Sequence, residues 1–259
     1  MSLRTVTATR YVTPLREGGS LPGLVEADDD GLYVVKFRAA GQGLKALIAE
    51  VLVGRLAQLA DLPVPELVLV ELDPALGAAE PDPEINELIT RSAGVNLGVD
   101  FLPGSLDFNP ARADAVSAAF ASEVVWFDAW TTNVDRTARN PNLLVWHGRT
   151  WLIDHGAALY RHHAGPGFAG HARDPFPLIA EHVLLRYAGA LEAADVRLSA
   201  VFGPAAVSEA LAAIPDEWLL GAGLGDGPDA ARDEYRSFLE ARLAGSREFT
   251  EEAIAARGA

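Results

Sequence analysis

Apolar and polar residues alternate in short runs over the first part of the chain. These runs predict strands over residues 5–12, 24–26 and 32–37, the first of them at a sheet edge. A glycine-rich stretch, 16–23, and an acidic turn, 28–31, separate the runs. The chain therefore opens with the order strand, glycine-rich loop, strand, turn, strand.

A helical period follows over residues 44–60. Apolar side chains recur there at spacings of three and four, namely Leu47, Ile48, Val51, Leu52, Leu56 and Leu59. Two further apolar runs, 65–72 and 87–90, predict strands, with an acidic insertion rich in Pro and Ala at 73–83 between them. Residues 92–105 predict an irregular connection.

The long apolar stretch 110–130 predicts a buried helix. Two short apolar runs on either side of the turn at Gly148 predict a β-hairpin. Further helices are expected at 178–190, at 205–214, at 230–244 and from 246 to the end.

Composition narrows the function classes. The 259 residues suffice for one large domain or for two lobes with a sizeable core. The absence of Cys excludes disulfides, thiolate zinc sites and Cys nucleophiles. A net charge of −15 without a basic run argues against nucleic acid or an anionic membrane as the main partner. No apolar run of membrane-spanning length and no signal peptide is found, so we expect a soluble, cytoplasmic protein.

The polar loop before the hairpin and the segment after it carry the candidate chemistry. Asp135 and Asn140 lie five residues apart in the loop, and an Asp-x-Gly step begins at Asp154. Because the entry and exit of a hairpin lie close together, these three side chains can converge. Phosphoryl transfer needs a carboxylate beside the attacking hydroxyl, and an amide plus a second carboxylate to hold Mg²⁺. The combination predicts a kinase-like site, although each half alone is typical of an ordinary turn.

Residues nearer the N-terminus fit a nucleotide. Gly18, Gly19 and Ser20 can approach phosphates with backbone N–H groups and a hydroxyl, although such tripeptides are common in turns. Lys36 follows this loop on an apolar strand, where kinases place the lysine that binds the α- and β-phosphates. A lysine on such a strand can equally face solvent. Glu50, in the next helix, can pair with Lys36 or lie at the surface.

The order of these motifs resembles the HipA-like kinases, which belong to the protein-kinase-like superfamily beside the phosphatidylinositol kinases. The motifs are the Gly-Gly-Ser loop, Val-Val-Lys-Phe, the helix with Glu50, Asp-Arg-Thr-Ala-Arg-Asn and Ile-Asp-His-Gly, and they span nearly the whole chain. Many members carry Asp-Arg-His-x-x-Asn, whereas Thr137 replaces that His here. The resemblance implies an α+β, two-lobed protein-kinase-like fold, with a β-rich N-lobe over 1–103 and a mainly helical C-lobe over 104–259.

The resemblance also implies roles for the candidate residues. Asp135 would act as the catalytic base or position the hydroxyl, and Lys36 would hold the α- and β-phosphates under the glycine-rich loop. Asn140 and Asp154 would bind Mg²⁺. The chain would thus be an ATP- and Mg²⁺-dependent phosphotransferase.

The irregular connection at 92–105 would be the hinge between the lobes. Its backbone would meet adenine, and Phe101 and Leu102 would pack on the ring. Both residues are equally typical of a simple core.

The acceptor of the phosphate is expected to be a protein serine or threonine. Two alternatives share the motifs. One is a small-molecule phosphotransferase of the aminoglycoside kinase type, and the other is a pseudokinase that binds nucleotide without turnover. Label transferred from ATP to protein would favour the protein kinase, and ATP binding that is independent of substrate would favour the pseudokinase.

Histidines gather after the Asp-x-Gly step, at His162, His163 and His171. Clustered imidazoles can bind a metal, so a metal hydrolase is a further alternative. The ordinary interpretation is a set of mobile, solvated imidazoles near an activation or substrate segment. Stoichiometric zinc in the purified protein would distinguish the two.

Overall fold

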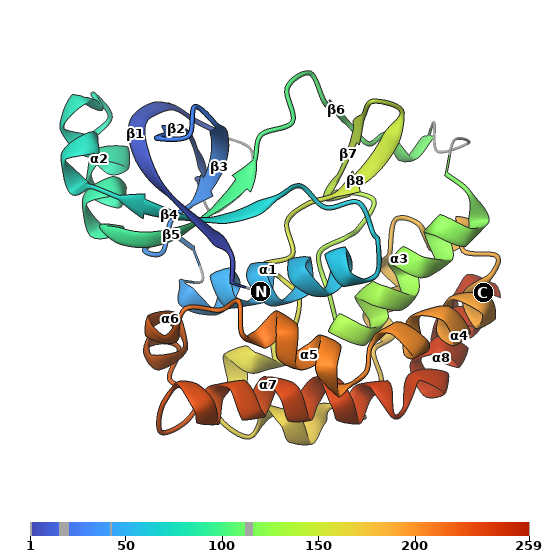
Figure 1. Ribbon diagram of the computed structural model, residues 1–259. Helices are drawn as coiled ribbons and strands as arrows, with labels where there is room; N and C mark the ends of the chain where they lie inside the picture. The colour runs from blue at the N-terminus through green and yellow to red at the C-terminus, as the bar shows by residue number, and fades with distance from the viewer. Residues whose placement is uncertain (1, 16–20, 42, 112–115, 259) are drawn as a thin grey trace.

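The computed structural model describes residues 2–15, 21–41, 43–111 and 116–258 (Figure 1). Its N-terminal part is a closed barrel with the strand order β1-β2-β3-β5-β4. These strands are β1 (Arg4–Pro14), β2 (Gly23–Ala27), β3 (Leu32–Lys36), β4 (Leu67–Leu72) and β5 (Gly94–Asp100).

β1 is not the edge strand that its sequence predicts. Its first half, from Arg4 to Thr7, pairs in parallel with β4, and its second half, from Ala8 to Pro14, pairs antiparallel with β2. Register shifts in the second pairing bend the strand. Because β1 is 11 residues long, it reaches both neighbours and the barrel closes.

The strand predicted at 87–90 is wrong, because these residues belong to the helix α2 (Pro83–Arg91). The Asp82 side chain caps this helix at its N-terminus. Ile85 and Ile89 are one helical turn apart and pack into the core of the barrel. A short apolar run cannot by itself distinguish a strand from one buried helical face.

β5 lies inside the stretch 92–105 that predicts an irregular connection. Asn96 and Gly98 interrupt its apolar pattern, yet it pairs with both β3 and β4. The acidic insertion before α2 forms the short 3-10 helix η1 (Pro74–Ala79). Residues 101–105 then lead from the barrel to the rest of the chain.

The predicted helix at 44–60 is confirmed as α1 (Leu44–Leu59), which lies below the barrel in Figure 1. It contacts β5 on one side and α5 (Pro204–Leu211) and α6 (Asp216–Gly221) on the other. Contacts on several sides explain why its side chains are buried nearly all round. α1 therefore shares one hydrophobic core with the C-terminal helices.

The C-terminal part is built mainly of helices around α3 (Ala118–Thr131), which begins later than predicted because Ser117 caps it. Trp126 and Trp130 of α3 stack with Phe202 in the core. Further helices are α4 (Leu191–Val201), α7 (Pro228–Leu243) and α8 (Ser246–Gly258).

The helix predicted at 178–190 is wrong. At His182 the backbone is extended and forms a β-bridge to Thr137, so a continuous helix cannot pass through it. The other three late helices correspond to α5, α7 and α8, whereas α4 and α6 were not predicted. The 3-10 helices before α4 are η3 (Tyr160–Ala164), η4 (Phe168–His171), η5 (Pro177–Glu181) and η6 (Leu185–Tyr187).

The predicted hairpin is confirmed as β7 (Leu143–Trp146) and β8 (Arg149–Leu152), and β6 (Leu106–Asp107) pairs with β7. His147 and Gly148 both have positive φ, at 48° and 74°, as a tight hairpin turn requires. A β-rich part followed by a mainly helical part confirms the α+β class. The lobe boundary between 103 and 104 stays a prediction.

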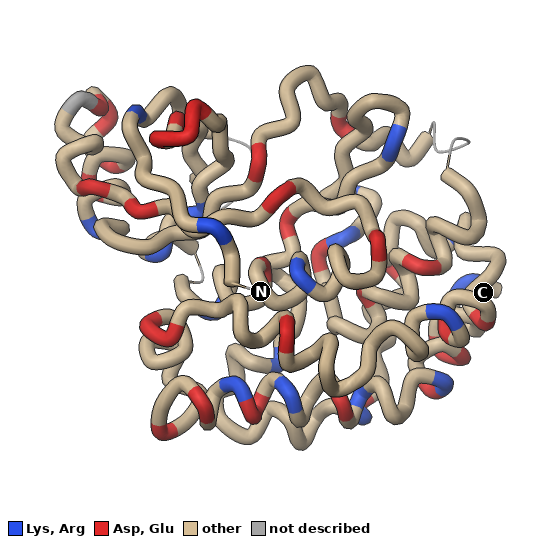
Figure 2. Tube along the Cα trace, viewed as in Figure 1, with Lys and Arg blue, Asp and Glu red and all other residues tan. Residues whose placement is uncertain are grey.

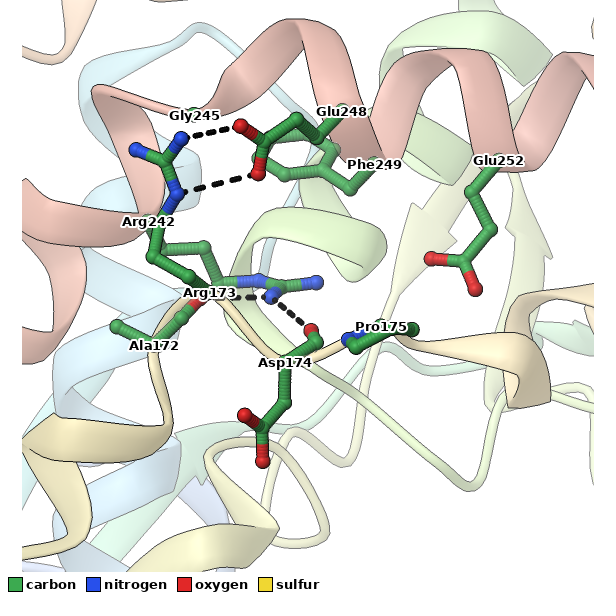
Figure 3. Close-up of a pocket in the computed structure, with 9 residues that line it drawn as sticks. All are labelled: Ala172, Arg173, Asp174, Pro175, Arg242, Gly245, Glu248, Phe249 and Glu252. Atoms are coloured by element: carbon green, nitrogen blue, oxygen red, sulfur yellow. Dashed lines mark hydrogen bonds and ion pairs between the residues drawn. The ribbon is translucent and has the colours of Figure 1, made fainter.

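A hollow of about 300 Å³ between α8 and the segment 172–175 is closed from inside by Arg242 of α7 (Figure 3). The guanidinium of Arg242 donates to the carbonyls of Ala129, Ala172 and Asp174 at 2.8–3.2 Å. Burial lowers the pKa of Arg242 to about 10. Since its hydrogen bonds join α7, α3 and the segment after η4, this arginine is a structural cross-link.

Acidic positions are spread over both parts of the molecule, with Lys and Arg interspersed among them rather than gathered in one band (Figure 2). Within the described ranges, none of the helices combines the length and apolar character needed to cross a membrane.

Candidate active site

A cleft of about 1190 Å³ lies between the barrel and the β6-β7-β8 sheet. Its lining includes five of the residues that the sequence singles out, namely Lys36, Phe101, Leu102, Asn140 and Asp154. Asp135 does not line the cleft itself, but its carboxylate is one hydrogen bond from Asn140. Residues from distant parts of the chain therefore meet in one place, as predicted.

Lys36, at the end of β3, connects the barrel to the segment after the hairpin. Its Nζ forms an ion pair with Glu50 of α1 and a second one, at 2.9 Å, with Asp154 Oδ1. Glu50 also accepts a hydrogen bond of 2.8 Å from the backbone N–H of Gly156. The predicted Lys36–Glu50 pairing is thus confirmed, and the alternatives of a solvent-facing lysine and a surface glutamate are wrong.

The Asp-x-Gly step has the backbone geometry that this contact needs. Asp154 adopts a left-handed conformation, with φ of 54°, which turns its side chain out of the strand direction. A Cβ on Gly156 would lie 3.0 Å from Glu50 Oε1, which is tighter than ordinary contact. Glycine therefore lets the backbone approach the glutamate closely enough to donate.

The electrostatics of this cluster favour a charged pair in the cleft. Burial alone would lower the pKa of Lys36, but the carboxylates of Glu50 and Asp154 outweigh burial and raise it. Burial alone would raise the pKa of Asp154, but Lys36 holds it well below its usual value. Burial raises the pKa of Glu50 to about 7. The ammonium of Lys36 and the carboxylate of Asp154 are consequently charged at neutral pH.

Asp135 and Asn140 are joined through the amide nitrogen of the asparagine, which donates to Asp135 Oδ2 at 2.7 Å. A carboxylate only accepts, so this contact fixes the orientation of the amide and leaves its carbonyl oxygen available. Asn142 donates a second, longer bond of 3.4 Å to the same oxygen. The turn itself is closed by the Thr137 N–H, which donates to the Asn140 carbonyl at 3.0 Å.

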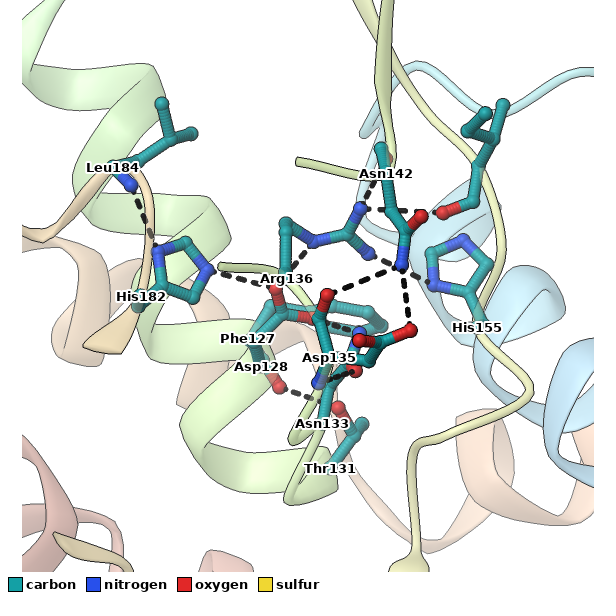
Figure 4. A network of polar contacts seen from close by, with 11 residues as sticks. Phe127, Asp128, Thr131, Asn133, Asp135, Arg136, Asn142, His155, His182 and Leu184 are labelled. Carbon is teal, nitrogen blue, oxygen red and sulfur yellow. Dashed lines mark hydrogen bonds and ion pairs between the residues drawn. The ribbon is translucent and has the colours of Figure 1, made fainter. Parts of the chain in front are cut away.

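A buried polar network holds this loop from below (Figure 4). Arg136 donates to Asp128 Oδ2 at 2.6 Å, and His182 Nε2 lies 2.9 Å from the same oxygen. Because His182 Nδ1 accepts from the Leu184 N–H, its proton is on Nε2 and points to Asp128. Burial alone would raise the pKa of Asp128, but Arg136 and His182 hold it well below its usual value.

The same arginine ties the loop that carries Asp135 and Asn140 to the Asp-x-Gly segment. Arg136 donates to the carbonyls of Asn142 and Ile153, and its Nη2 lies 3.2 Å from His155 Nδ1. Burial lowers the pKa of His155 to about 3, so this ring is neutral. The sequence analysis missed this network. Asp128 was its visible signal, as an acid in the otherwise apolar stretch 124–130 of α3.

Two groups of candidate nucleotide contacts have different outcomes. Phe101 and Leu102 both line the cleft. The N–H groups of Asp100 and Phe101 donate to the carbonyls of Glu66 and Leu32. These two N–H groups are therefore already used, and the N–H of Leu102 is the next one along the connection.

The glycine-rich loop residues Gly18, Gly19 and Ser20 lie outside the described residues. On either side of them, Leu15 and Pro22 line the cleft, and the Leu15 N–H donates to the Pro22 carbonyl at 2.8 Å.

The histidine-rich segment does not match its interpretation as solvated imidazoles. His162 is buried, with Nδ1 3.0 Å from the Tyr235 hydroxyl and Nε2 3.1 Å from His163. His171 is exposed and pairs with Asp174. In the part of the chain that the structure describes, no group of three or more possible ligands could hold a metal ion. The segment is thus partly a packing element.

The sequence model of the HipA-like kinase family matches residues 9–223. The chain therefore belongs to the HipA-like kinases, as the motifs predict. No curated protein sequence matches it.

Solved structures of kinases share the fold. The proinflammatory kinase CtkA of Helicobacter pylori matches with a TM-score of 0.59 and 11% identity, covering 98% of this chain and 99% of that chain. Golgi casein kinase with Mn and ADP bound matches with a TM-score of 0.54 and 14% identity, covering 99% and 74%. A second Golgi casein kinase structure matches with a TM-score of 0.52 and 14% identity, covering 99% of this chain and 73% of that chain. At these identities the likeness shows the fold alone. Family and fold together make the protein a kinase, with a nucleotide as one substrate.

Proposed function

We propose that the protein transfers the γ-phosphate of ATP, with Mg²⁺, to a hydroxyl group of an acceptor. The observation that carries the proposal is the joining of Lys36, Asn140 and Asp154 in one cleft, with Asp135 hydrogen-bonded to Asn140. Phosphoryl transfer uses side chains of these types to orient the phosphates and to neutralise their charge.

In this proposal each residue has a separate task. Asp135 accepts the proton of the attacking hydroxyl, and its bonds from Asn140 and Asn142 keep the carboxylate oriented. Lys36 binds the α- and β-phosphates, and Glu50 holds its ammonium toward the cleft. Leu102 and Phe101 offer an apolar surface and an amide to adenine.

The side chains at the cleft fit a magnesium ion. Mg²⁺ prefers hard oxygen ligands, and it is usually held by one or two protein groups plus phosphates. Asn140 bonds to Asp135 through its side-chain nitrogen, so its side-chain carbonyl oxygen can bind the ion. The Asp154 carboxylate accepts from Lys36 and retains further lone pairs. When bound, the ion would neutralise negative charge on the phosphates.

As the acceptor we propose a protein serine or threonine. Asn140 is exposed and Asp154 is 46% exposed at the side chain, so a bulky acceptor can reach the end of the cleft. This exposure favours a protein over a small alcohol that must be enclosed.

The test is transfer of label from γ-labelled ATP with Mg²⁺. Wild-type protein should label itself or added protein. Base treatment should release the label, as it does from phosphoserine and phosphothreonine. Label on added aminoglycosides but never on protein would overturn the acceptor. ATP binding without any turnover would overturn the transfer itself.

A further inference from the structure

One cation in the cleft has no partner among the residues that the structure describes. Among the described residues that line the cleft, Lys36 and Arg139 carry positive charge. Lys36 is paired with Glu50 and Asp154, whereas Arg139 is exposed and forms no ion pair or hydrogen bond with any other described residue. The chain has 36 acidic residues and 21 Lys and Arg, so carboxylate partners are abundant. An unpaired arginine at this place is therefore available for a ligand.

The backbone of Arg139 is fixed relative to the catalytic groups. It lies in the turn that the Thr137 N–H closes onto the Asn140 carbonyl at 3.0 Å and the Asn140 N–H closes onto Thr137 Oγ1 at 3.3 Å. The next residue, Asn140, is bonded to Asp135. The backbone of Arg139 is thus held beside both the candidate base and a candidate metal ligand, while its side chain stays free to reach a ligand.

We propose that Arg139 binds the γ-phosphoryl group during transfer and stabilises the negative charge on its oxygens. This inference rests on the proposed function. The planar guanidinium matches a phosphate with parallel N–H donors. Lys36 is directed to the α- and β-phosphates, so the γ-phosphoryl group needs a second cation of this kind.

The step balances with the groups named. The acceptor oxygen forms a bond to the γ-phosphorus as its proton passes to Asp135. The bond between the γ-phosphorus and the bridging oxygen breaks, and its electron pair stays on the β-phosphate of ADP. Arg139 forms and breaks no covalent bond, and its contribution is electrostatic.

The experiment compares Arg139→Ala and Arg139→Lys with wild type in three measurements. These are the dissociation constant of Mg·ADP, the additional rise in Tm when aluminium fluoride is added to Mg·ADP as a mimic of the transferring phosphoryl group, and kcat for ATP turnover. Arg139→Ala should bind Mg·ADP within about twofold of wild type, lose most of the fluoride-dependent rise, and lose about 10²–10³ in kcat. Arg139→Lys should recover part of both losses, because it restores the charge without the paired donors.

A matched control is Arg247→Ala. Arg247 is an exposed arginine of α8 that pairs with Glu251 one turn away, so its removal changes the net charge equally at a distance from the cleft. This variant should behave as wild type in all three measurements. A normal Tm without ligand for Arg139→Ala would show that it folds, as expected for an exposed side chain.

The outcomes separate the two proposals. An Arg139→Ala protein with the full fluoride-dependent rise and unchanged kcat would overturn the role of Arg139 and leave the kinase proposal intact. A fall confined to the phosphorylation of an acidic acceptor would also overturn this role, because Arg139 would then bind the acceptor and not the γ-phosphoryl group. A wild-type protein with no Mg·ADP shift and no turnover would overturn both.

Discussion

Two polar clusters adjoin at the Asp-x-Gly segment, where Arg136 contacts Ile153 and His155 on either side of Asp154, and they differ in their access to solvent. The cluster of Lys36, Glu50 and Asp154 opens onto the cleft, where the Asp154 side chain is 46% exposed. The cluster of Asp128, Arg136 and His182 is closed, with the Asp128 and Arg136 side chains fully buried. The open cluster holds the Asp-x-Gly segment, and the closed cluster holds the loop that carries Asp135.

The difference separates two physical tasks. A buried charge is tolerated only when every partner is in place, so the closed cluster must be complete before any substrate arrives. In the open cluster, the proposed function requires the Asp154 carboxylate and the Lys36 ammonium to exchange their mutual contact for a metal ion and phosphates. Variants of the closed cluster should therefore lower stability, and variants at the open end should lower activity.

The largest effect is expected from Asp128→Ala. Removing this carboxylate leaves the Arg136 guanidinium buried without its counter-charge and deprives His182 of its acceptor. We expect a loss of about 3–5 kcal/mol in the free energy of unfolding, measured by urea denaturation. Asp174→Ala, at a half-exposed ion pair with Arg161, is the control and should cost less than about 1 kcal/mol. Equal losses in the two variants would contradict the division of tasks.

Asp135→Asn should lower activity and leave stability nearly unchanged, the reverse of Asp128→Ala. The side chain keeps its size, and its neighbours in the loop remain, so the urea midpoint and ATP binding should stay near wild type. A base or positioning carboxylate contributes about 10²–10⁴ in rate, and turnover should fall by such a factor. Turnover at the wild-type rate would remove Asp135 from the chemistry.

The open cluster was predictable from sequence and the closed one was not. Lys36 and Glu50 each belong to a local motif, a strand after a glycine-rich loop and a helix of strict period, so their meeting follows from the order of elements. His182 is 54 residues from Asp128, and no local pattern marks its return to the loop. Its extended backbone also replaces the helix that the apolar residues around it predict.

The errors in the fold have a similar cause. The hairpin and α1 were predicted because turn residues and periodicity are written in contiguous sequence. β5 was missed because Gly98 and Asn96 are fixed by neighbours in the closed barrel, and Asn96 bonds to the Arg38 N–H outside its own strand. Tertiary pairing decides such segments more than their own pattern does.

Asp154→Asn tests whether the open cluster really exchanges partners for a metal. The wild type should gain more Tm with ATP plus Mg²⁺ than with either alone, since binding contributes about 2.7 kcal/mol at a hundredfold excess over Kd. Asp154→Asn should lose most of this synergy and keep the metal-free ATP shift that comes from Lys36. Asp107→Asn removes an acid from the same cleft without touching the Lys36 pair, and it should keep the synergy. Unchanged synergy in Asp154→Asn would exclude Asp154 as a metal ligand.

The effect that is smallest at neutral pH concerns the ring of His162, which is buried without a counter-charge. This ring is buried against Tyr235 and His163, and burial lowers its pKa to about 3 from an unfolded value near 6.5. Between these two values the unfolded chain binds a proton that the folded chain does not. Stability from this group is therefore complete above pH 6.5 and falls as the pH decreases toward 3, by about 1.4 kcal/mol per pH unit.

The measurement is the free energy of unfolding from pH 7 to pH 4 for wild type and His162→Gln. Groups common to both proteins cancel in the difference, so the advantage of the wild type should shrink with that slope below pH 6.5. Tyr235→Phe is the matched control, because it removes the hydrogen bond at Nδ1 but leaves the ring buried. It should lower stability at every pH and keep the slope, since burial and not the hydroxyl displaces the pKa of His162. If Tyr235→Phe abolished the slope, the hydrogen bond would be the cause, and the buried histidine would behave like the partnered residues of the closed cluster.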